Sequence, residues 1–243
     1  MGTKERRQRE VAEREALFLD VALELVREES LLNLQMSRIA EKAEYAVGTL
    51  YLHFSSKEDL LLALVTRTVK DYYDLTRKAS EWKAPSRDRM FAVGVGDLVF
   101  VKKHPDYFRI VQYILCEVAW NAASEQRKQA FHDANRPGLN LVSTIVEDAR
   151  RSGDLEIDGQ TAEELALGVW AICSGYHNFT HAEGLLNHLS ITEPYFLMCR
   201  HLQNLLDGYH WKPIAGPAEP QAISALIERI KKEVFPEDLC NAA

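Results

Sequence analysis

Apolar side chains recur every three or four positions through most of the chain, which is the spacing of helices that bury one face. The first such segment covers residues 8–29, where Phe18, Ala22 and Leu25 share a face and the opposite face is charged. The segments are rich in Leu, Ala, Glu, Lys and Arg, which favour helix. We find no alternating run of β-branched residues bounded by turns. The chain is therefore predicted to be all-α.

Proline and glycine divide the rest of the chain into further helices. Residues 3–84 contain no proline and a single glycine, Gly48. Ser55 and Glu58 fit a capping box with Ser55 as the N-cap, and Thr161 with Glu164 offers another helix start. The helices expected after the first cover residues 36–43, 47–54, 55–80, 87–103, 105–116, 124–151 (with Pro137 as a potential break), 161–182, 192–206 and 221–234.

Residues 36–54 form a helix-turn-helix candidate, because two short helices are joined by only Glu44, Tyr45 and Ala46. In such a unit the second helix lies in the major groove of DNA and the first crosses the backbone. The residues expected to form the small core that fixes the angle between the helices are Ile39, Ala40, Ala43, Leu50 and Phe54.

The polar positions of the same segment suit contact with DNA. Thr49, Tyr51 and His53 are expected to point away from the core toward phosphates or base edges. Gly48 would let the backbone approach the sugar–phosphate closely. Lys57 falls in the first turn of the next helix, where free backbone N–H groups also favour a phosphate.

Three consecutive motifs carry a family resemblance: Ile39–Ala43, then Gly48–Tyr51, then His53–Leu61. Together they resemble the DNA-binding signature of the tetracycline-repressor (TetR) family. The match is strong over residues 36–62 and covers only the all-α architecture beyond. The resemblance implies a homodimeric transcription factor, usually a repressor, that binds a near-palindromic operator and is released by a small molecule.

The resemblance also implies a domain organisation and a set of DNA contacts. Residues 1–62 would form the DNA-binding head, residues 63–210 a helical-bundle body for ligand binding and dimerisation, and residues 211–243 a tail with a short helix. The start of the third helix would read bases, and the polar positions after it would mainly contact the backbone. The predicted DNA-binding residues are Ser37, Arg38, Tyr45, Ala46, Val47, Gly48, Thr49, Tyr51, His53 and Lys57.

The turn departs from the family pattern, which usually reads Gly-Val-Ser where this chain has Glu44, Tyr45 and Ala46. A non-glycine residue in a left-handed conformation costs about 1 kcal/mol. Either Glu44 tolerates this cost or the turn is shaped differently. Gln35 stands where the family usually has the threonine that caps the second helix. Ala46 stands where it usually has a serine that can contact phosphate.

The N-terminal basic cluster has two readings. Lys4, Arg6, Arg7 and Arg9 would suit an arm that reaches the minor groove or the DNA backbone. They alternate with acidic residues, so a solvated, disordered end fits equally well.

The predicted body, residues 63–210, contains many aromatic side chains, and a helical bundle of this size can enclose a mainly apolar pocket. An apolar or aromatic effector is therefore expected. The residues predicted to line its site are Gln112, Cys116, Trp120, Trp170, Cys173 and His177. Gly168, Ile172 and Gly175 share a helical face that could serve a dimer interface or a tight crossing within the chain. His177 and His181 have metal-ligand spacing, but two histidines do not make a site, and no metal or cofactor is expected.

Composition narrows the class of protein. The 243 residues carry a formal charge of −7, of which residues 1–80 contribute −1 (13 basic, 14 acidic) and residues 81–243 contribute −6 (16 basic, 22 acidic). DNA attraction must then come from a few placed groups. The N-terminus has no apolar core of a signal peptide, no segment suits a membrane span, and the four cysteines form no C-x-x-C pair, so a cytoplasmic protein is expected.

No phosphate-binding loop or nucleophile motif is present in the sequence, so we expect a regulator and not an enzyme. The alternative is a helical small-molecule carrier or enzyme that keeps a vestigial helix-turn-helix. A repressor is expected, although the sequence alone cannot separate repression from activation of transcription.

Overall fold

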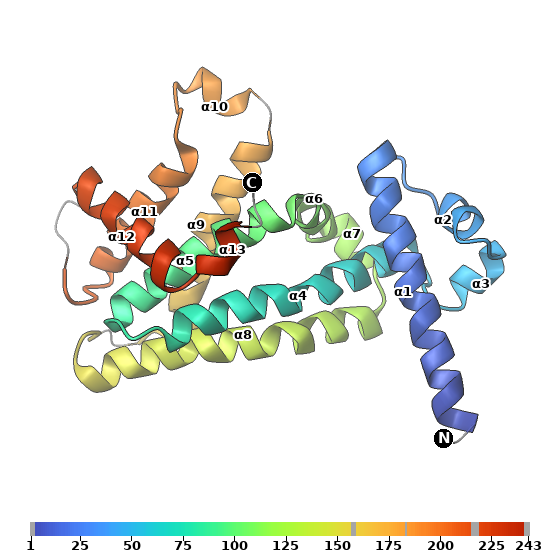
Figure 1. The fold of residues 1–243 in the computed structure, drawn as a ribbon, viewed down its shortest axis with the longest axis horizontal. Coiled ribbons are helices and arrows are strands. Elements are labelled where there is room, and N and C mark those ends of the chain that lie inside the picture. Colours follow the sequence, from blue (N-terminus) through green and yellow to red (C-terminus); the bar gives the residue numbers. More distant parts are fainter. Residues whose placement is uncertain (1–2, 157–158, 183, 215–218, 241–243) are drawn as a thin grey trace. The chain divides into compact units, whose positions relative to one another are not determined.

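A computed structural model describes residues 3–156, 159–182, 184–214 and 219–240. The described residues contain helices and no strands, which confirms the all-α prediction (Figure 1). The helices are α1 (Thr3–Glu29), α2 (Met36–Lys42), α3 (Val47–Tyr51), α4 (Lys57–Glu81), α5 (Ser86–Lys103), α6 (Pro105–Ile114), α7 (Glu117–Ala122), α8 (Glu125–Ser152), α9 (Ala162–His181), α10 (Leu185–His188), α11 (Pro194–Gly208), α12 (Pro220–Glu233) and α13 (Pro236–Cys240).

The chain forms two compact units whose boundaries differ from the expected division at residues 62 and 210. The first unit comprises residues 1–68 and 105–134, and the second comprises residues 69–104 and 135–243. The difference arises because α6, α7 and the start of α8 pack with the N-terminal helices. Ile110, Ile114 and Ala119 belong to the same buried cluster as Phe18 and Leu61.

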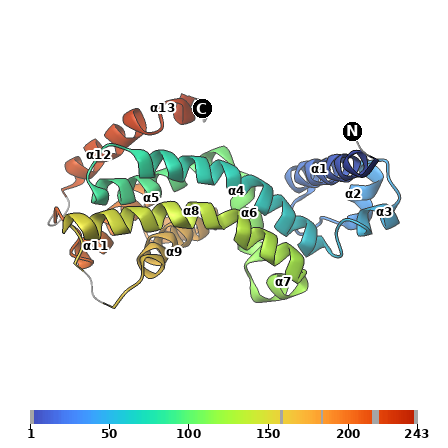
Figure 2. The ribbon, with the colours of Figure 1, turned by 90° about the horizontal axis from the view of Figure 1, so that it is seen from below.

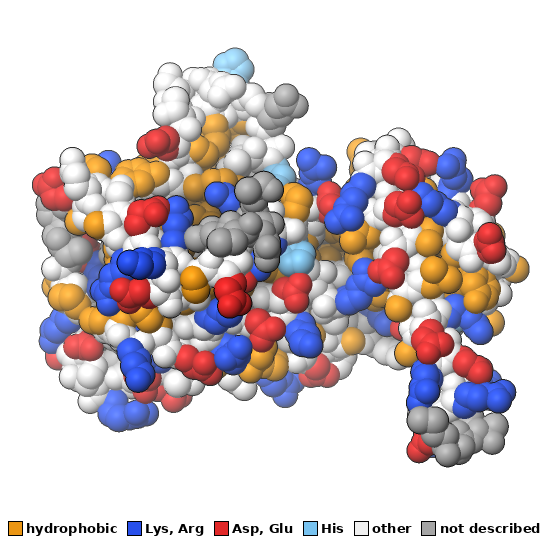
Figure 3. Space-filling view, viewed as in Figure 1, with side chains coloured by type: hydrophobic (Ala, Val, Ile, Leu, Met, Phe, Trp, Pro, Cys, Tyr) orange, Lys and Arg blue, Asp and Glu red, His pale blue; other side chains and the backbone are white. Residues whose placement is uncertain are grey.

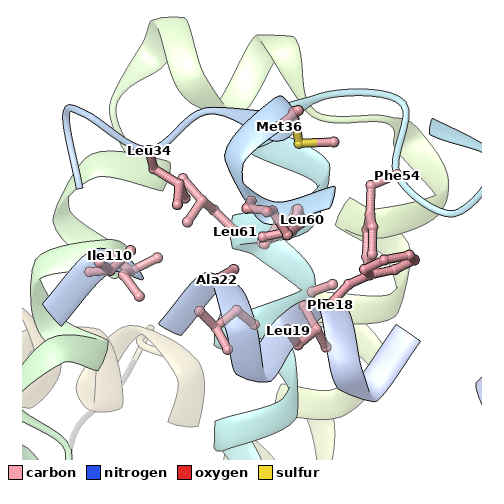
Figure 4. Packing of buried hydrophobic residues seen from close by; sticks show 14 of the residues in the cluster. Phe18, Leu19, Ala22, Leu34, Met36, Phe54, Leu60, Leu61 and Ile110 are labelled. Carbon is pink, nitrogen blue, oxygen red and sulfur yellow. The ribbon is translucent and has the colours of Figure 1, made fainter. Parts of the chain in front are cut away.

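The first unit is built around this cluster, in which α1 supplies Phe18, Leu19 and Ala22 and α4 supplies Leu60 and Leu61 (Figure 4). Each of these side chains is at most 6% exposed. Fully burying one large apolar side chain contributes about 1.5–3 kcal/mol, so the cluster accounts for much of the stability of this unit.

The second unit is a bundle in which α5 lies among α9, α11 and α12 (Figures 1 and 2). Arg87 of α5 is buried and ties this bundle together. Its guanidinium donates to the carbonyl of Trp211 at 2.7 Å and to the side chain of Gln203 at 2.7 Å, and it pairs with Asp207 at 2.8 Å. These contacts satisfy a charge that would otherwise be costly to bury.

The N-terminal caps of α9 and α4 compare with the sequence prediction in different ways. The helix start predicted at Thr161 and Glu164 is confirmed and takes the form of a capping box, since each side chain accepts a hydrogen bond from the other's backbone N–H. The capping box predicted at Ser55 and Glu58 is wrong by one residue. Ser56 Oγ accepts from the N–H of Asp59 at 3.0 Å, and Glu58 instead accepts from the hydroxyl of Tyr113.

Several boundaries also differ from the expected ones. α1 begins at Thr3, α3 ends at Tyr51, and α8 continues through Pro137. The short helices α7, α10 and α13 were not predicted, because four to six residues show no clear period. Residues 215–218 of the expected connector lie outside the described residues.

Asp59 joins the start of α4 to the corner between α7 and α8. Its carboxylate is 3% exposed and accepts from the N–H of Ser55 at 3.1 Å, from the Ser55 hydroxyl at 2.5 Å and from the N–H of Ser124 at 2.7 Å. Burial alone would raise the pKa of Asp59, but these donors outweigh it and hold the pKa below the usual value.

We expect Asp59→Asn to lower the free energy of unfolding by about 1–3 kcal/mol at pH 7, because the amide satisfies the buried donors less well. The lowered pKa means that this stabilisation is complete above the unfolded carboxyl pKa of about 3.9 and disappears as the pH falls through the folded value. Urea unfolding at several pH values would therefore show the difference closing below about pH 4. Asp74→Asn, at a half-exposed position of α4, is the control; equal stability of wild type and Asp59→Asn at pH 7 would contradict this account.

Candidate nucleic-acid interface

The turn between α2 and α3 takes the left-handed conformation despite its lack of glycine. Glu44 has φ 60°, and the following Tyr45 N–H donates to the carbonyl of Ala40 at 2.9 Å, which closes the end of α2. Glu44 thus tolerates the strain of about 1 kcal/mol that the sequence suggested. Gln35, at the start of α2, makes no side-chain capping bond.

Tyr45 fastens this turn to α1. Its ring meets Phe18 edge-on with centroids 5.4 Å apart, and the guanidinium of Arg14 lies 5.5 Å from the same ring. The side chain nevertheless remains 38% exposed. Tyr45 therefore helps to fix the turn against α1, and part of its ring remains exposed to solvent beside α3.

The predicted core of the helix-turn-helix is present. Ile39, Ala40, Leu50 and Phe54 are completely buried, and Ala43 is 7% exposed. Because α3 has only five residues, this packing fixes its orientation.

The outer face of α3 is exposed and carries no charged side chain. Ala46 and Gly48 are exposed, Val47 is 39% exposed and Tyr51 is 50% exposed, while Thr49 is half-buried. Leu52 is 86% exposed and was not among the predicted residues. Its position could have been found, because two residues after buried Leu50 a helix has turned to nearly the opposite side.

The nearby cations are already paired in the free protein. Arg38 pairs with Glu29 at 2.5 Å, and Lys42 pairs with Glu28 at 2.8 Å. The hydrogen bond that Lys42 donates to the Glu28 carboxylate is the main cause of the raised pKa of Lys42. Lys57 donates to the carbonyl of Leu31 at 3.1 Å. A phosphate contact by Arg38 or Lys57 would therefore replace an existing interaction.

His53 does not face outward as predicted. Its side chain is 6% exposed, its ring meets Phe18 edge-on at 5.5 Å, and Nδ1 lies 3.5 Å from Glu15 Oε1. The prediction assumed that the helix continues through His53. Instead α3 ends at Tyr51, and the chain turns inward toward the buried Phe54. In this conformation the imidazole supports the head from inside.

Arg127 of α8 binds the end of the helix-turn-helix at His53. Its Nη2 donates to the carbonyl of His53 at 3.0 Å and to Glu15 at 3.1 Å, and its guanidinium lies 4.9 Å from the centroid of Phe54. Sequence reasoning missed this residue, since it lies 74 positions from His53. Arg127 thus links α1, α3 and α8 within the first unit.

The basic N-terminal cluster lies on α1 itself. Lys4, Arg6, Arg7 and Arg9 are exposed on this helix, and Arg6 pairs with Glu10 at 3.1 Å. Basic and acidic side chains lie next to each other at this end of α1 (Figure 3). The structure thus describes a helix here, where the sequence suggested an arm or a disordered end.

The six predicted effector-site residues fall into both units. Gln112, Cys116 and Trp120 belong to the first unit, in or beside α6 and α7, whereas the other three lie on α9 of the second unit. Cys116 is exposed, and Trp120 packs edge-on against Phe131 at 6.0 Å. None of the six lines the cavity of about 250 Å³ that lies between α5, α11 and α12.

On α9, Cys173 and His177 are buried beside α5. His177 Nε2 lies 2.6 Å from Asp97 Oδ2, and burial together with the charge of Asp97 raises the pKa of the Cys173 thiol. Trp170, by contrast, is 49% exposed. Gly168 serves a crossing within the chain, since a Cβ there would lie 2.3 Å from the hydroxyl of Tyr209, while one on Gly175 would meet nothing within 4 Å.

Among the described residues, no three His, Cys, Asp or Glu side chains gather in a way that could hold a metal ion. His181 Nδ1 instead lies 2.8 Å from the backbone carbonyl of His177. No described helix has the length and apolar character to cross a membrane.

An all-α chain that presents the second helix of a helix-turn-helix over a rigid core has the architecture of a DNA-binding transcriptional regulator. Residues 18–64 match the family described as "Bacterial regulatory proteins, tetR family". The matched segment contains α2 and α3, the two helices of the helix-turn-helix.

The chain is also similar to a known relative in sequence and to solved structures in fold. The chain is 23% identical over 158 residues to the fatty acid metabolism regulator protein of Bacillus subtilis (strain 168), covering 62% of this chain and 76% of the relative. Its fold is similar to the regulator FadR from Bacillus subtilis in complex with stearoyl-CoA (TM-score 0.59, 19% identity, 79% of this chain and 98% of that one). It is also similar to a tetR-family regulatory protein from Rhodococcus RHA1 (TM-score 0.59, 17% identity, 81% and 96%).

We expect Gly48→Ala to weaken operator binding by about tenfold or more, equivalent to about 1.4 kcal/mol, because the added methyl group would stand between α3 and the DNA backbone. The free protein should be slightly stabilised, by about 0.5–1 kcal/mol, because a Cβ at this helical position meets no atom within 4 Å. Fluorescence anisotropy with a duplex selected by the wild type from random DNA, and thermal unfolding, measure the two effects. Gly138→Ala in α8 is the matched control, since its Cβ also meets nothing within 4 Å; unchanged DNA affinity of Gly48→Ala would rule out close approach at this position.

We expect Arg127→Ala to weaken binding to the same duplex by about tenfold through loss of the grip on α3. The slope of log affinity against log salt should stay unchanged, because Arg127 is assigned no phosphate. Lys128→Ala, which removes the neighbouring cation, should bind like the wild type. A slope reduced by about one in Arg127→Ala would instead identify Arg127 as a phosphate contact.

Proposed function

We propose that the protein is a homodimeric transcriptional repressor that binds a near-palindromic operator and is released from it by a small molecule. The observation that carries the proposal is the exposed face of α3, held over a fully buried core within the segment that matches the tetR family. A major-groove helix needs this combination of exposed side chains and rigid support. We further propose that the protein acts in the cytoplasm, where its DNA target lies.

The proposed reading surface keeps most of the residues predicted from the sequence. Base contacts come from the start of α3, from Tyr45 before it and from Tyr51 at its end. Leu52 adds an apolar contact suited to a thymine methyl group. Arg38 and Lys57 bind phosphates after exchanging their present partners, and His53 supports the surface from within. The proposed DNA-binding residues are Ser37, Arg38, Tyr45, Ala46, Val47, Gly48, Thr49, Tyr51, Leu52 and Lys57.

The proposed dimer uses the outer face of α9. Leu167 is 56% exposed and Trp170, one turn further along, is 49% exposed, so two large apolar side chains of this helix lie at the surface of a single chain. A two-fold dimer would bury them and place two reading heads on half-sites about one DNA turn, roughly 34–36 Å, apart.

The proposed effector is an acyl-type molecule. The support is indirect: the relative in Bacillus subtilis is a fatty acid metabolism regulator, and the similar FadR structure holds stearoyl-CoA. An effector releases the protein only if it binds the DNA-incompetent conformation better than the competent one.

The decisive experiment is binding of the purified protein to its selected duplex and to a scrambled duplex across salt concentrations. We expect sequence-preferring, salt-sensitive binding by a dimer, and Trp170→Glu should give a monomer with operator affinity lowered by about a hundredfold or more, because one head loses its partner. Light scattering coupled to gel filtration reports the oligomer. Leu139→Glu, at a 51%-exposed leucine of α8, is the control and should remain dimeric. Equal binding to both duplexes would refute the proposed function, and a dimeric Trp170→Glu would refute the assigned interface.

A further inference from the structure

The second unit contains a cavity that the predicted effector residues do not touch. It has a volume of about 250 Å³ and lies between α5, α11 and α12. Its walls are mainly apolar: Val95 and Val99 come from α5, Phe196 from α11 and Ile227 from α12. The two valines are at most 3% exposed and form the apolar floor of the cavity.

Two lysines and one glutamate also line this cavity, and the glutamate pairs with only one of the lysines. Lys231 and Glu228, both on α12, pair at 2.7 Å. Lys102 of α5 is exposed and has no ion pair or hydrogen bond within the described part of the chain. One uncompensated positive charge thus stands beside an apolar cavity, which is the chemistry that recognises an anionic head on an apolar tail.

The size of the cavity restricts the ligand further. Pockets for small molecules usually measure about 300–1,000 Å³, so this one accepts a single acyl chain or a single ring. The nucleotide of a coenzyme A thioester would have to lie outside this volume, so a free acid fits the cavity better. Cys199 also lines the cavity, but burial raises the pKa of its thiol to about 12, so it stays protonated and packs as an apolar group.

The other side of α12 is fastened to the end of α4. The guanidinium of Arg229 lies 4.8 Å from the centroid of the Trp82 ring, and Trp82 Nε1 donates to Glu233 at 3.0 Å. Trp82 directly follows the last residue of α4. In α13, Asp238 pairs with Lys78 of α4 at 2.7 Å and also with Lys103 of α5. A ligand that displaces α12 therefore acts on the helix that begins directly after the helix-turn-helix.

We propose that this cavity binds a free medium-chain carboxylate, with its tail against Val95, Val99 and Ile227 and its carboxylate at Lys102. We further infer that occupancy changes operator affinity through the contacts of α12 and α13 with the end of α4. The binding stands by itself, whereas the effect on DNA rests on the proposed function.

Calorimetric titration with decanoate tests the binding. We expect decanoate to bind the wild type, and decanol and decanoyl-CoA to bind at least about tenfold more weakly, because the first lacks the charge and the second exceeds the cavity. Lys102→Gln should weaken decanoate binding about tenfold. Glu228→Gln should strengthen it, since Lys231 is then released for the carboxylate. Lys70→Gln, an exposed lysine of α4, is the control.

The outcomes separate the site from the function. No decanoate binding to the wild type, or equal affinity of the wild type and Lys102→Gln with unchanged thermal unfolding, would overturn the site. Tighter binding of decanoyl-CoA than of decanoate would overturn the ligand class. If the protein binds no operator at all, the proposed function fails while the calorimetric result still decides the site.

The coupling is tested by operator affinity with and without decanoate. We expect a change of about tenfold in the wild type. In Trp82→Ala, decanoate should still bind, but its effect on operator affinity should be lost. An operator affinity that decanoate leaves unchanged in the wild type, despite binding, would overturn the coupling.

Discussion

The DNA-reading function depends on a five-residue helix that cannot hold its own position. An isolated helix of this length is unstable in water, because nucleation costs more than so few hydrogen bonds return. The orientation of α3 comes from Leu50 and Phe54, which insert into the cluster that α1 and α4 complete. Tyr45, just before α3, packs against Phe18, and Arg127 donates to the carbonyl of His53, just after α3. The exposed face of α3 is therefore set by residues that do not belong to α3.

This arrangement gives the head an unusual electrostatic character. The face of α3 carries no charge, and Arg38, Lys42 and Lys57 are bound to Glu29, Glu28 and the backbone carbonyl of Leu31. In the proposed complex, phosphates would have to replace these partners. The proposed reading surface would then depend more on shape and apolar contact with the bases than on charge. The charge of −7, with most of the excess acid beyond residue 80, fits the same picture.

Two helices carry the connections on which regulation can act. α4 begins at the N-cap Ser56, directly after the helix-turn-helix, and ends beside Trp82, where α12 and α13 are attached. α8 begins with Ser124 bonded to Asp59 and with Arg127 bonded to His53. Both helices run through both compact units of the chain.

The sequence by itself determined the features that depend on short-range spacing. The helical period determined the all-α class, the run from Ile39 to Leu61 identified the helix-turn-helix, and the Thr161–Glu164 capping box needed only residues three apart. Only the tertiary structure decided features that depend on distant partners. The Ser55 hydroxyl is not the cap but donates to the Asp59 carboxylate, which also accepts from the N–H of Ser124, 65 positions away. His53 turns inward because Glu15 and Phe18 receive it there. A side chain's neighbours along a helix follow from its period, but its neighbours across the fold follow from packing, which periodicity does not encode.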